Sequence, residues 1–191
     1  YIDRVLADPG GDEFVELLDV ISTNLTSFFR ESQHFDYLAQ IHLPSVVKRN
    51  QGVKRIRGWS AGCSSGEEPY TTSIVLSETL PKLGAGRGWD VKLLATDLST
   101  RVLRKAQAGV YETERVKTVS RELLGKYFEP RTKDGDPHYA VSPAIRSLVV
   151  FNRLNLMEPW PFNGPFDFIF CRHVMIYFDK PTQERLVNRY Y

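Results

Sequence analysis

The feature that most constrains this chain is a run of small residues between a strand-like and a helix-like segment. The run Ser60-Ala61-Gly62-Cys63-Ser64-Ser65-Gly66 follows a β-type stretch, Val53–Trp59, and precedes a helical stretch, Glu67–Leu80. A strand, a tight turn without bulky side chains and a helix N-terminus form a place where backbone can approach a ligand closely. This arrangement predicts a nucleotide-type cofactor site in an α/β sheet.

The residues after the turn narrow the kind of cofactor. The glycine spacing is not the G-x-G-x-x-G of dinucleotide sites, and Glu67 and Glu68 follow the turn at once. Carboxylates at a helix N-terminus interact favourably with the helix dipole, but they repel a pyrophosphate bound there. The stretch therefore predicts a site for a cofactor without phosphates, and a cationic cofactor is compatible with it.

Strands and helices continue to alternate beyond this turn. Pro69 fits the first turn of one helix, Gly109 marks the end of another, and Pro44 limits how regular a third can be. The alternation predicts a mostly parallel sheet with right-handed crossovers. The predicted strands are Lys54–Ser60, Trp89–Asp97, Ser147–Leu156 and Phe166–Cys171, and the predicted helices are Gln33–Val47, Glu67–Leu80, Arg101–Ala108 and Pro181–Tyr191.

Residues 110–147 interrupt this alternation. A short helix, Ser120–Phe128, precedes a polar turn at 131–137, which Tyr139–Val141 and Ala144–Leu148 could flank as short antiparallel strands. We interpret the segment as a small insertion packed beside the main sheet. At the start of the chain, residues 1–21 suit a short amphipathic helix, and the lack of an initial Met suggests an excised fragment.

Composition excludes several classes of protein. The chain of 191 residues is 42% apolar and 25% charged, as in a soluble globular domain, and its net charge of +2 gives no field for nucleic acid. No apolar run approaches the roughly 20 residues needed to span a bilayer. Cys63 and Cys171 give no disulfide framework and favour a reducing, cytoplasmic setting. No metal site is expected, because these cysteines share no ligand spacing with His34, His42 or His138.

Polar residues follow each predicted strand. Ligands in open parallel sheets bind beyond the carboxyl ends of the strands, so these residues would share one edge. Asp97 is placed to accept both hydroxyls of a ribose, or it caps the helix that follows. Asn155 could bond an adenine edge, or it holds a turn. The residues at this edge are Ser60–Glu68, Asp97, Asn155-Leu156 and Arg172-His173.

The segment Thr23–Glu31 leaves two interpretations open. Its Asn and Thr residues precede an aromatic pair, Phe28-Phe29, in a way typical of turns and helix caps. Either the segment caps a helix with both rings in the core, or Asn24, Thr26 and Arg30 line the site.

Five blocks of the sequence occur together in the order of a known family. The blocks are Thr23-x-x-Thr26-x-Phe28-Phe29-Arg30-Glu31, Ser60-Ala61-x-x-Ser64-x-Gly66-Glu67-Glu68-Pro69-Tyr70, Ala95-x-Asp97, Asn155-Leu156 and Phe166-Asp167-x-Ile169-Phe170-Cys171-Arg172-x-Val174-Met175-Ile176-Tyr177-Phe178. The T-x-F-F-R-E and G-E-E-P-Y elements are specific well beyond generic methyltransferase signals. Together the blocks resemble the CheR-type chemotaxis receptor methyltransferases, over nearly the whole chain from about residue 20 onward.

The resemblance implies a fold and an activity. It implies a Rossmann-like class I S-adenosyl-L-methionine-dependent methyltransferase, with residues 23–191 as the catalytic domain, 110–147 as an inserted antiparallel β-subdomain, and 1–22 as the end of an N-terminal helical region or a linker. Such enzymes methylate glutamate side chains in the cytoplasmic region of membrane chemoreceptors, giving glutamyl methyl esters and S-adenosyl-L-homocysteine. In some members the β-subdomain binds a peptide at the receptor C-terminus. Neither a nucleic-acid partner nor membrane insertion is expected.

The resemblance also implies roles for individual residues. Arg30 and Tyr177 would be catalytic, with Arg30 positioning the substrate carboxylate and Tyr177 near the transferred methyl group. Glu68 would take the amino group of the methionine part, and Asp97 the ribose. The cofactor-binding residues implied in this way are Asn24, Thr26, Arg30, Ala61, Gly62, Glu68, Asp97, Asn155, Leu156, Arg172 and His173.

Two features depart from the family pattern. His173 stands where the family commonly has Asn, which could make cofactor contact depend on pH near neutrality. The chain ends at Tyr191, before the last strands expected of such a sheet, so we expect a C-terminally truncated domain with an exposed edge.

Two other functions stay open on the residues alone. A methyltransferase-like domain could bind the cofactor or its product and signal without catalysis, although intact Arg30 and Tyr177 count against this. A nicotinamide-dependent oxidoreductase is the other alternative, and the glycine spacing together with Glu67-Glu68 argues against it.

Overall fold

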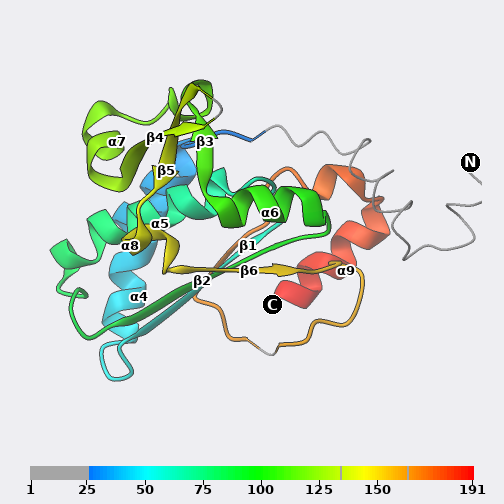
Figure 1. The fold of residues 1–191 in the computed structure, drawn as a ribbon. Coiled ribbons are helices and arrows are strands. Elements are labelled where there is room, and N and C mark those ends of the chain that lie inside the picture. Colours follow the sequence, from blue (N-terminus) through cyan, green and yellow to red (C-terminus); the bar gives the residue numbers. More distant parts are fainter. Residues whose placement is uncertain (1–25, 134, 163) are drawn as a thin grey trace, which may run out of the picture.

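A parallel sheet and a smaller antiparallel sheet organise the chain (Figure 1). The computed structural model describes residues 26–133, 135–162 and 164–191, so the predictions for residues 1–22 and for Asn24 lie outside the described residues. All strand pairs of the larger sheet are parallel, which confirms the predicted arrangement. Its strands are β1 (Arg55–Ala61), β2 (Asp90–Asp97), β6 (Val149–Arg153) and β7 (Phe168–Phe170), in the order β6-β2-β1-β7.

This strand order creates a switch point beside β1. The strands β2 and β6 extend the sheet on one side of β1, whereas β7, which comes last, pairs on the other side. Connections from strands on either side of such a point leave in opposite directions and open a crevice at the carboxyl ends. The ends of β1 and β7 therefore meet where a ligand is expected.

The helices follow the predicted pattern with one interruption. The segment predicted as one helix, Gln33–Val47, is an α-helix, a π-turn and a second α-helix, with Pro44 at the start of the last piece. Proline lacks an amide donor and its ring crowds the preceding turn, which accounts for the wider turn before it. The helices outside the inserted segment are α3 (Gln33–Tyr37), η1 (Leu38–His42), α4 (Leu43–Arg49), α5 (Glu67–Thr79), η2 (Pro81–Leu83), α6 (Thr100–Ala108), η4 (Met175–Tyr177) and α9 (Lys180–Tyr190).

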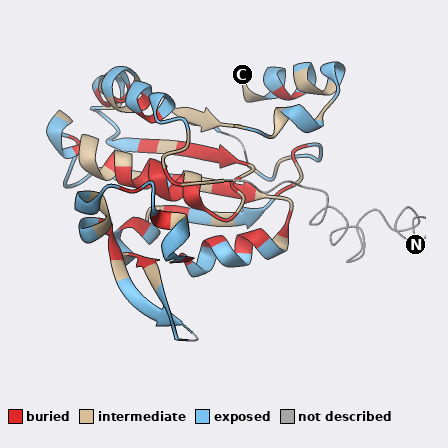
Figure 2. Cartoon of the chain, turned by 90° about the horizontal axis from the view of Figure 1, so that it is seen from above, coloured by how far each residue is buried: buried red, intermediate tan, exposed pale blue. Residues whose placement is uncertain are grey.

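Both faces of the parallel sheet are covered, and the buried residues gather in its strands and in the helices packed on them (Figure 2). On one face, residues of α5 and α6 such as Ile74 and Leu103 pack with Leu93 of β2. On the other face, Trp59 of β1 packs with Leu186 of α9. Burial on both faces explains why the sequence of these strands is rich in apolar residues.

Gly58 of β1 permits a close approach between strands. A Cβ built at this position would lie 2.3 Å from Cζ of Phe168, its partner in β7. The missing side chain therefore leaves room for the Phe168 ring over β1 and allows β7 to pair at this register.

The inserted segment forms the second sheet, a three-stranded antiparallel one of order β3-β5-β4. The outer part of its hairpin is largely exposed (Figure 2). The prediction of a strand at Ala144–Leu148 was wrong: Pro143–Arg146 form helix α8, because Pro143 suits a first helical turn. The elements are β3 (Val110–Glu112), η3 (Thr113–Val116), α7 (Arg121–Tyr127), β4 (Phe128–Lys133), β5 (Asp136–Val141) and α8 (Pro143–Arg146).

Two negative findings apply to the described ranges alone. None of their helices combines the length and the apolar character that crossing a membrane would require. The same ranges contain no cluster of His, Cys, Asp and Glu side chains that could hold a metal ion.

Candidate functional site

The hydrogen bonds of the turn after β1 agree with the prediction of a cofactor without phosphates. The amides of Gly62 and Cys63 both donate to the carbonyl oxygen of Thr96, at 2.8 and 2.9 Å. The next amide, of Ser64, donates to Oδ2 of Asp97 at 2.8 Å. A phosphate cradle needs amides that point at the ligand. Three successive amides are already bonded within the protein, which argues against a dinucleotide cofactor here.

Asp97 fastens this turn to the end of β2. Its Oδ2 accepts from the Ser64 amide, and its Oδ1 accepts from the Ser99 amide at 3.0 Å. The alternative that Asp97 caps the following helix is wrong, because the N-cap of α6 is Ser99, whose Oγ accepts from the Val102 amide at 3.2 Å. The acid therefore lies at the carboxyl end of the sheet, as expected of a cofactor-binding residue.

Glu67, the first residue of α5, is fully buried. Its Oε2 accepts from Oγ of Ser65 at 2.7 Å, and its Oε1 lies 3.1 Å from the guanidinium of Arg115. Burial raises the pKa of this carboxyl, while the Ser65 hydrogen bond and the Arg115 charge oppose the rise. Glu67 therefore faces the inserted segment, from which Arg115 comes.

Glu68, the next residue, has different partners. It accepts from Oγ of Ser60 at 2.7 Å and from Nη1 of Arg172 at 3.2 Å. Burial raises the pKa of its carboxyl, and the Ser60 hydrogen bond and the Arg172 charge act against this. The residue thus joins the end of β1 to the segment after β7, across the switch point.

Arg172 extends this connection to the segment before α3. Its Nη2 donates to Oε2 of Glu31 at 2.9 Å and to the carbonyl oxygen of Arg30 at 2.5 Å. The same Glu31 oxygen lies 3.2 Å from Nε2 of His173. The hydrogen bond from Arg172 lowers the pKa of the Glu31 carboxyl. Arg172 therefore brings Arg30, Glu68 and His173, predicted from three distant blocks, to one place.

One part of the first interpretation of the segment before α3 is correct. Phe28 is in the core, edge-on to the rings of Tyr111 and Phe128 at centroid distances of 5.0 and 5.3 Å. The segment is a turn rather than a helix cap, since Ser32, which precedes α3, makes no capping bond with its side chain. The buried ring anchors the turn that precedes α3, and a site-lining role for Thr26 and Arg30 stays a prediction.

Backbone strain gathers at the same edge. Five non-glycine residues of the described ranges have positive φ, and four of them are Phe29, Glu31, Ser64 and His173, at 56°, 56°, 48° and 59°. Such conformations cost on the order of 1–3 kcal/mol each and concentrate where function requires a fixed geometry. Four of them in three segments that meet at the carboxyl edge mark this edge as the functional site.

The family follows from a comparison with known proteins. The family model described as "CheR methyltransferase, SAM binding domain" matches residues 24–191. The chain belongs to this family. Its cofactor is therefore S-adenosyl-L-methionine, and the fold is that of a Rossmann-like class I methyltransferase.

Relatives of the CheR family match the chain from end to end. It is 37% identical to a probable chemotaxis protein methyltransferase of Rhizobium etli, and 42% and 40% identical to chemotaxis protein methyltransferases of Borreliella burgdorferi and Salmonella typhimurium. Each match covers 100% of this chain, and 70%, 66% and 62% of the relatives. The chain thus spans about two thirds of the length of these CheR relatives.

The remaining residues implied by the CheR resemblance have the following positions. Ala61 ends β1 and is buried. The carbonyl oxygen of Thr26 accepts from Nη1 of Arg115 at 3.2 Å. Gly62 has a φ of 81°, and a Cβ there would lie 2.2 Å from a methyl carbon of Val174, so only glycine fits. Tyr177 lies in η4 beyond β7, with 52% of its surface exposed.

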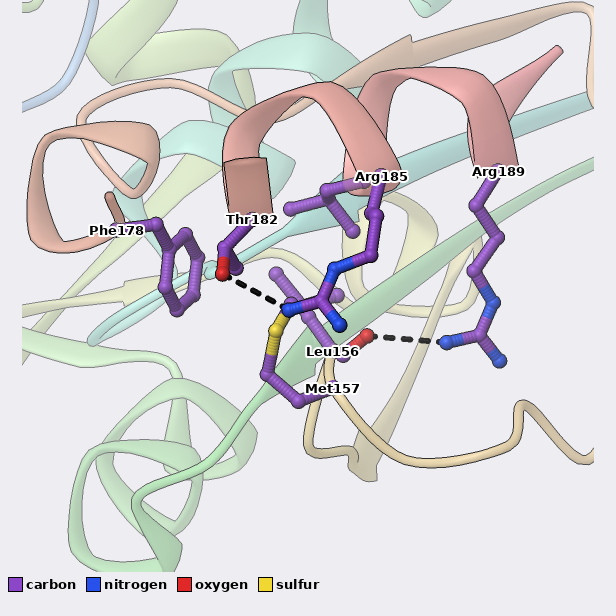
Figure 3. A pocket seen from close by; sticks show the side chains of 7 residues that line it. Leu156, Met157, Phe178, Thr182, Arg185 and Arg189 are labelled. Carbon is purple, nitrogen blue, oxygen red and sulfur yellow. Dashed lines mark hydrogen bonds between the residues drawn. The ribbon is translucent and has the colours of Figure 1, made fainter. Parts of the chain in front are cut away.

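Asn155 holds a turn, as one of its two interpretations stated. Its Oδ1 accepts from the Met157 amide at 3.0 Å, and its Nδ2 donates to Oε1 of Glu158 at 3.1 Å. The neighbouring Leu156 lines a cavity of about 540 Å³ beneath α9 (Figure 3). Arg189 of α9 reaches across and donates to the Leu156 carbonyl oxygen at 3.2 Å.

Cys63 also lies in the turn, and its thiol could in principle act as a nucleophile. It is buried, and burial together with the charges of Asp97 and Glu68 raises the pKa of its thiol well above the ordinary value. A thiol held neutral is a poor nucleophile. Cys63 therefore fills space in the turn and does not act as a nucleophile.

Sequence reasoning missed Arg115 as a contributor to the site. It comes from η3 of the inserted segment and touches the backbone of Thr26 and the side chains of Ser65 and Glu67. In the sequence it is one arginine among other charged residues, Glu112 to Lys117, with no spacing that marks it. The only available signal was indirect: a glutamate buried after the turn would need a cation.

Proposed function

We propose that this chain transfers the methyl group of S-adenosyl-L-methionine to glutamate side chains in the cytoplasmic region of membrane chemoreceptors, giving glutamyl methyl esters. Family membership and the names of the relatives support this. The observation that carries it is the pair of hydrogen bonds that the Arg172 guanidinium donates to Glu68 and to the carbonyl oxygen of Arg30. The contact supports a role for Arg30 beside an acidic cofactor edge, because the Arg30 carbonyl oxygen and the Glu68 carboxylate share one guanidinium. The reaction takes place in the cytoplasm, where the product S-adenosyl-L-homocysteine is released.

The polar atoms at the edge fit this cofactor. Two buried polar atoms, Nε of Arg172 and Oγ of Ser64, make no hydrogen bond within the described residues. A buried donor without a partner is costly and favours a ligand acceptor such as a carboxylate. The carboxylate of Glu68 suits an ammonium group. An amino acid carries both groups, which is the methionine part of the cofactor.

The other cofactor contacts are those that the resemblance to the CheR family implies. Glu68 takes the amino group of the methionine part, at the end of β1. Asp97, at the end of β2, takes the ribose hydroxyls. Leu156, beyond β6, borders the adenine together with Asn155. The remaining contacts come from Asn24, Thr26, Arg30, Ala61, Gly62, Arg172 and His173.

The reaction needs no general base. A glutamate side chain has a pKa of about 4.3 and is already ionised at neutral pH. When bound, S-adenosyl-L-methionine supplies an electrophilic methyl group on a sulfonium. Arg30 holds the substrate carboxylate by charge-assisted hydrogen bonds, and Tyr177 orients it. Fixing this geometry and excluding water lower the barrier, and orientation alone is worth on the order of 7–11 kcal/mol.

Replacing Arg30 tests the proposal. We expect Arg30→Ala to lower kcat for receptor methylation about 10- to 100-fold, because a charged hydrogen bond to the substrate is lost. Transfer of labelled methyl groups to receptor membranes measures this, and Arg104→Ala on the exposed face of α6 is the matched control. Wild-type rates in Arg30→Ala would show that Arg30 has no such role.

The same assay separates catalysis from binding alone. A signalling module without catalysis would bind S-adenosyl-L-homocysteine in calorimetry but transfer no label to receptors. Binding of NAD without binding of S-adenosyl-L-homocysteine would overturn the cofactor assignment. A peptide from the receptor C-terminus would bind the β-subdomain at 110–147 if this chain docks by tethering.

A further inference from the structure

Arg115 bonds to two segments that flank the cofactor site, although it belongs to neither. Its Nη1 donates to the Thr26 carbonyl oxygen at 3.2 Å, on the segment that leads to Arg30. Its Nη2 donates to Oγ of Ser65 at 3.2 Å and lies 3.1 Å from Oε1 of Glu67. One guanidinium therefore joins the segment before α3 to the turn after β1.

Glu67, the acid that Arg115 pairs with, needs a compensating positive charge. Glu67 is 0% exposed, and the charged groups that act on it are Arg115 and, at longer range, Lys105. A carboxylate removed from water needs a paired cation and satisfied hydrogen bonds. Ser65 supplies one bond through its hydroxyl, and Arg115 supplies the charge. Ser65 lies in the turn and Glu67 follows it directly. Arg115, which contacts both, therefore also fixes the shape of the turn.

Other residues of the inserted segment bond the same two places. The hydroxyl of Tyr111 donates to the Ser65 carbonyl oxygen at 2.7 Å, and Oγ1 of Thr118 donates to the Phe28 carbonyl oxygen at 2.7 Å. The inserted segment thus contacts the turn through Tyr111 and Arg115, and the segment before α3 through Arg115 and Thr118.

We propose that Arg115 is a positioning residue for the methyl-transfer site: it holds the turn after β1 and the segment before α3 in register, so that Glu68 and Arg30 face one cofactor. The inference rests on the proposed function. It assigns to the inserted segment a part in forming the cofactor site. The planar guanidinium is required because its fork makes two hydrogen bonds, to Thr26 and Ser65, and an ion pair with Glu67 at once, which the single ammonium of lysine does not match.

Arg115→Ala and Arg115→Lys test this role. We expect Arg115→Ala to weaken binding of S-adenosyl-L-homocysteine about tenfold or more and to raise KM for S-adenosyl-L-methionine by a similar factor. Once the cofactor concentration is saturating, kcat should change far less, since Arg115 touches no reacting group. Arg115→Lys should restore part of the affinity, because it returns a charge to Glu67 but does not span all three acceptors.

Two further variants keep the test decisive. Arg131→Ala is the matched control, an exposed arginine of the same insertion that pairs with Glu129. In the double variant Arg115→Ala with Glu67→Gln no buried charge is left without its partner, so it should be more stable than Arg115→Ala alone. If Arg115→Ala does not fold, the comparison of Arg115→Lys with the double variant still measures the loss of the fork.

The outcomes also separate this inference from the proposed function. Wild-type affinity and KM in folded Arg115→Lys and in the double variant would overturn the positioning role. Wild-type protein that binds S-adenosyl-L-homocysteine but methylates no receptor would overturn the proposed function and leave the binding test of Arg115 intact. A wild-type chain that does not bind S-adenosyl-L-homocysteine would overturn both.

Discussion

Two arginine-centred clusters connect the segment before α3 with residues in or directly after the turn that follows β1. The first, here the Arg172 cluster, consists of Arg172, Glu68, Glu31 and His173, at the end of β7. The second, here the Arg115 cluster, consists of Arg115, Glu67, Ser65 and the Thr26 carbonyl group. The arginine side chain is 11% exposed in the first and 40% exposed in the second, whereas the buried acid is Glu68 at 13% and Glu67 at 0%.

The difference in exposure indicates that the two arginines have different roles at the site. Arg172 is nearly buried itself and keeps a donor, Nε, without a partner in the described residues, as a ligand-binding group does. Arg115 is half exposed and serves an acid that is completely buried, as a structural partner does. The two clusters therefore share an architecture but not a role. Changes in one cluster can therefore be compared with changes in the other.

Loss of Arg172 should have the largest effect. Arg172→Ala leaves Glu68 largely buried without a cation and detaches Glu31 and the Arg30 carbonyl group, and breaking such a pair costs about 3–5 kcal/mol. We expect affinity for S-adenosyl-L-homocysteine to fall at least about 100-fold, and further than in Arg115→Ala. Calorimetry on both variants measures this. Equal losses in the two would contradict the division of roles.

Glu31 of the Arg172 cluster and Glu67 of the Arg115 cluster should respond to pH with opposite signs. The pKa of Glu31 is lowered, so its contribution to stability is present above the ordinary value of 4.5 and is lost as pH falls through its folded pKa. The pKa of Glu67 is raised, so its contribution is largest below 4.5 and declines as pH rises through its folded pKa.

Denaturant unfolding from about pH 3 to 7 measures this contrast. Glu67→Gln should gain stability relative to the wild type as pH rises above about 4.5, whereas Glu31→Gln should lose relative stability as pH rises from acid towards about 4.5. Both variants remove one ionisable group from an arginine cluster, so each is a control for the other. Curves that run parallel to the wild type in both variants would show that neither acid is perturbed.

His173→Asn should have the smallest effect. Its φ of 59° suits asparagine, which tolerates the left-handed region, and the change loses only an exposed contact with Glu31. Unfolding free energy should change by less than about 0.5 kcal/mol. Affinity for S-adenosyl-L-homocysteine should change by less than about threefold, because asparagine can also donate or accept a hydrogen bond at this position. A loss of affinity as large as in Arg172→Ala would contradict this ranking.

The sheet and much of the site could be predicted from sequence because they depend on local patterns. The apolar run Phe166–Cys171 marked a buried parallel strand, and the ends of successive strands had to share an edge. Gly109 marked the end of α6 through capping chemistry, and the structure confirms it. The antiparallel insertion was less predictable, since short strands depend on the partner they find, and Ala144–Leu148 found none.

By itself, the sequence determined the fold class, the family and the cofactor, because periodicity, capping and the T-x-F-F-R-E and G-E-E-P-Y blocks are properties of neighbouring residues. The tertiary structure decided which side chains meet. It bonded the amides of Gly62, Cys63 and Ser64 to Thr96 and Asp97, which leaves none of these three amides to cradle a phosphate. It also paired Glu67 with Arg115, 48 positions apart in the chain. Such pairing depends on burial, which makes an isolated charge costly only after the chain has folded.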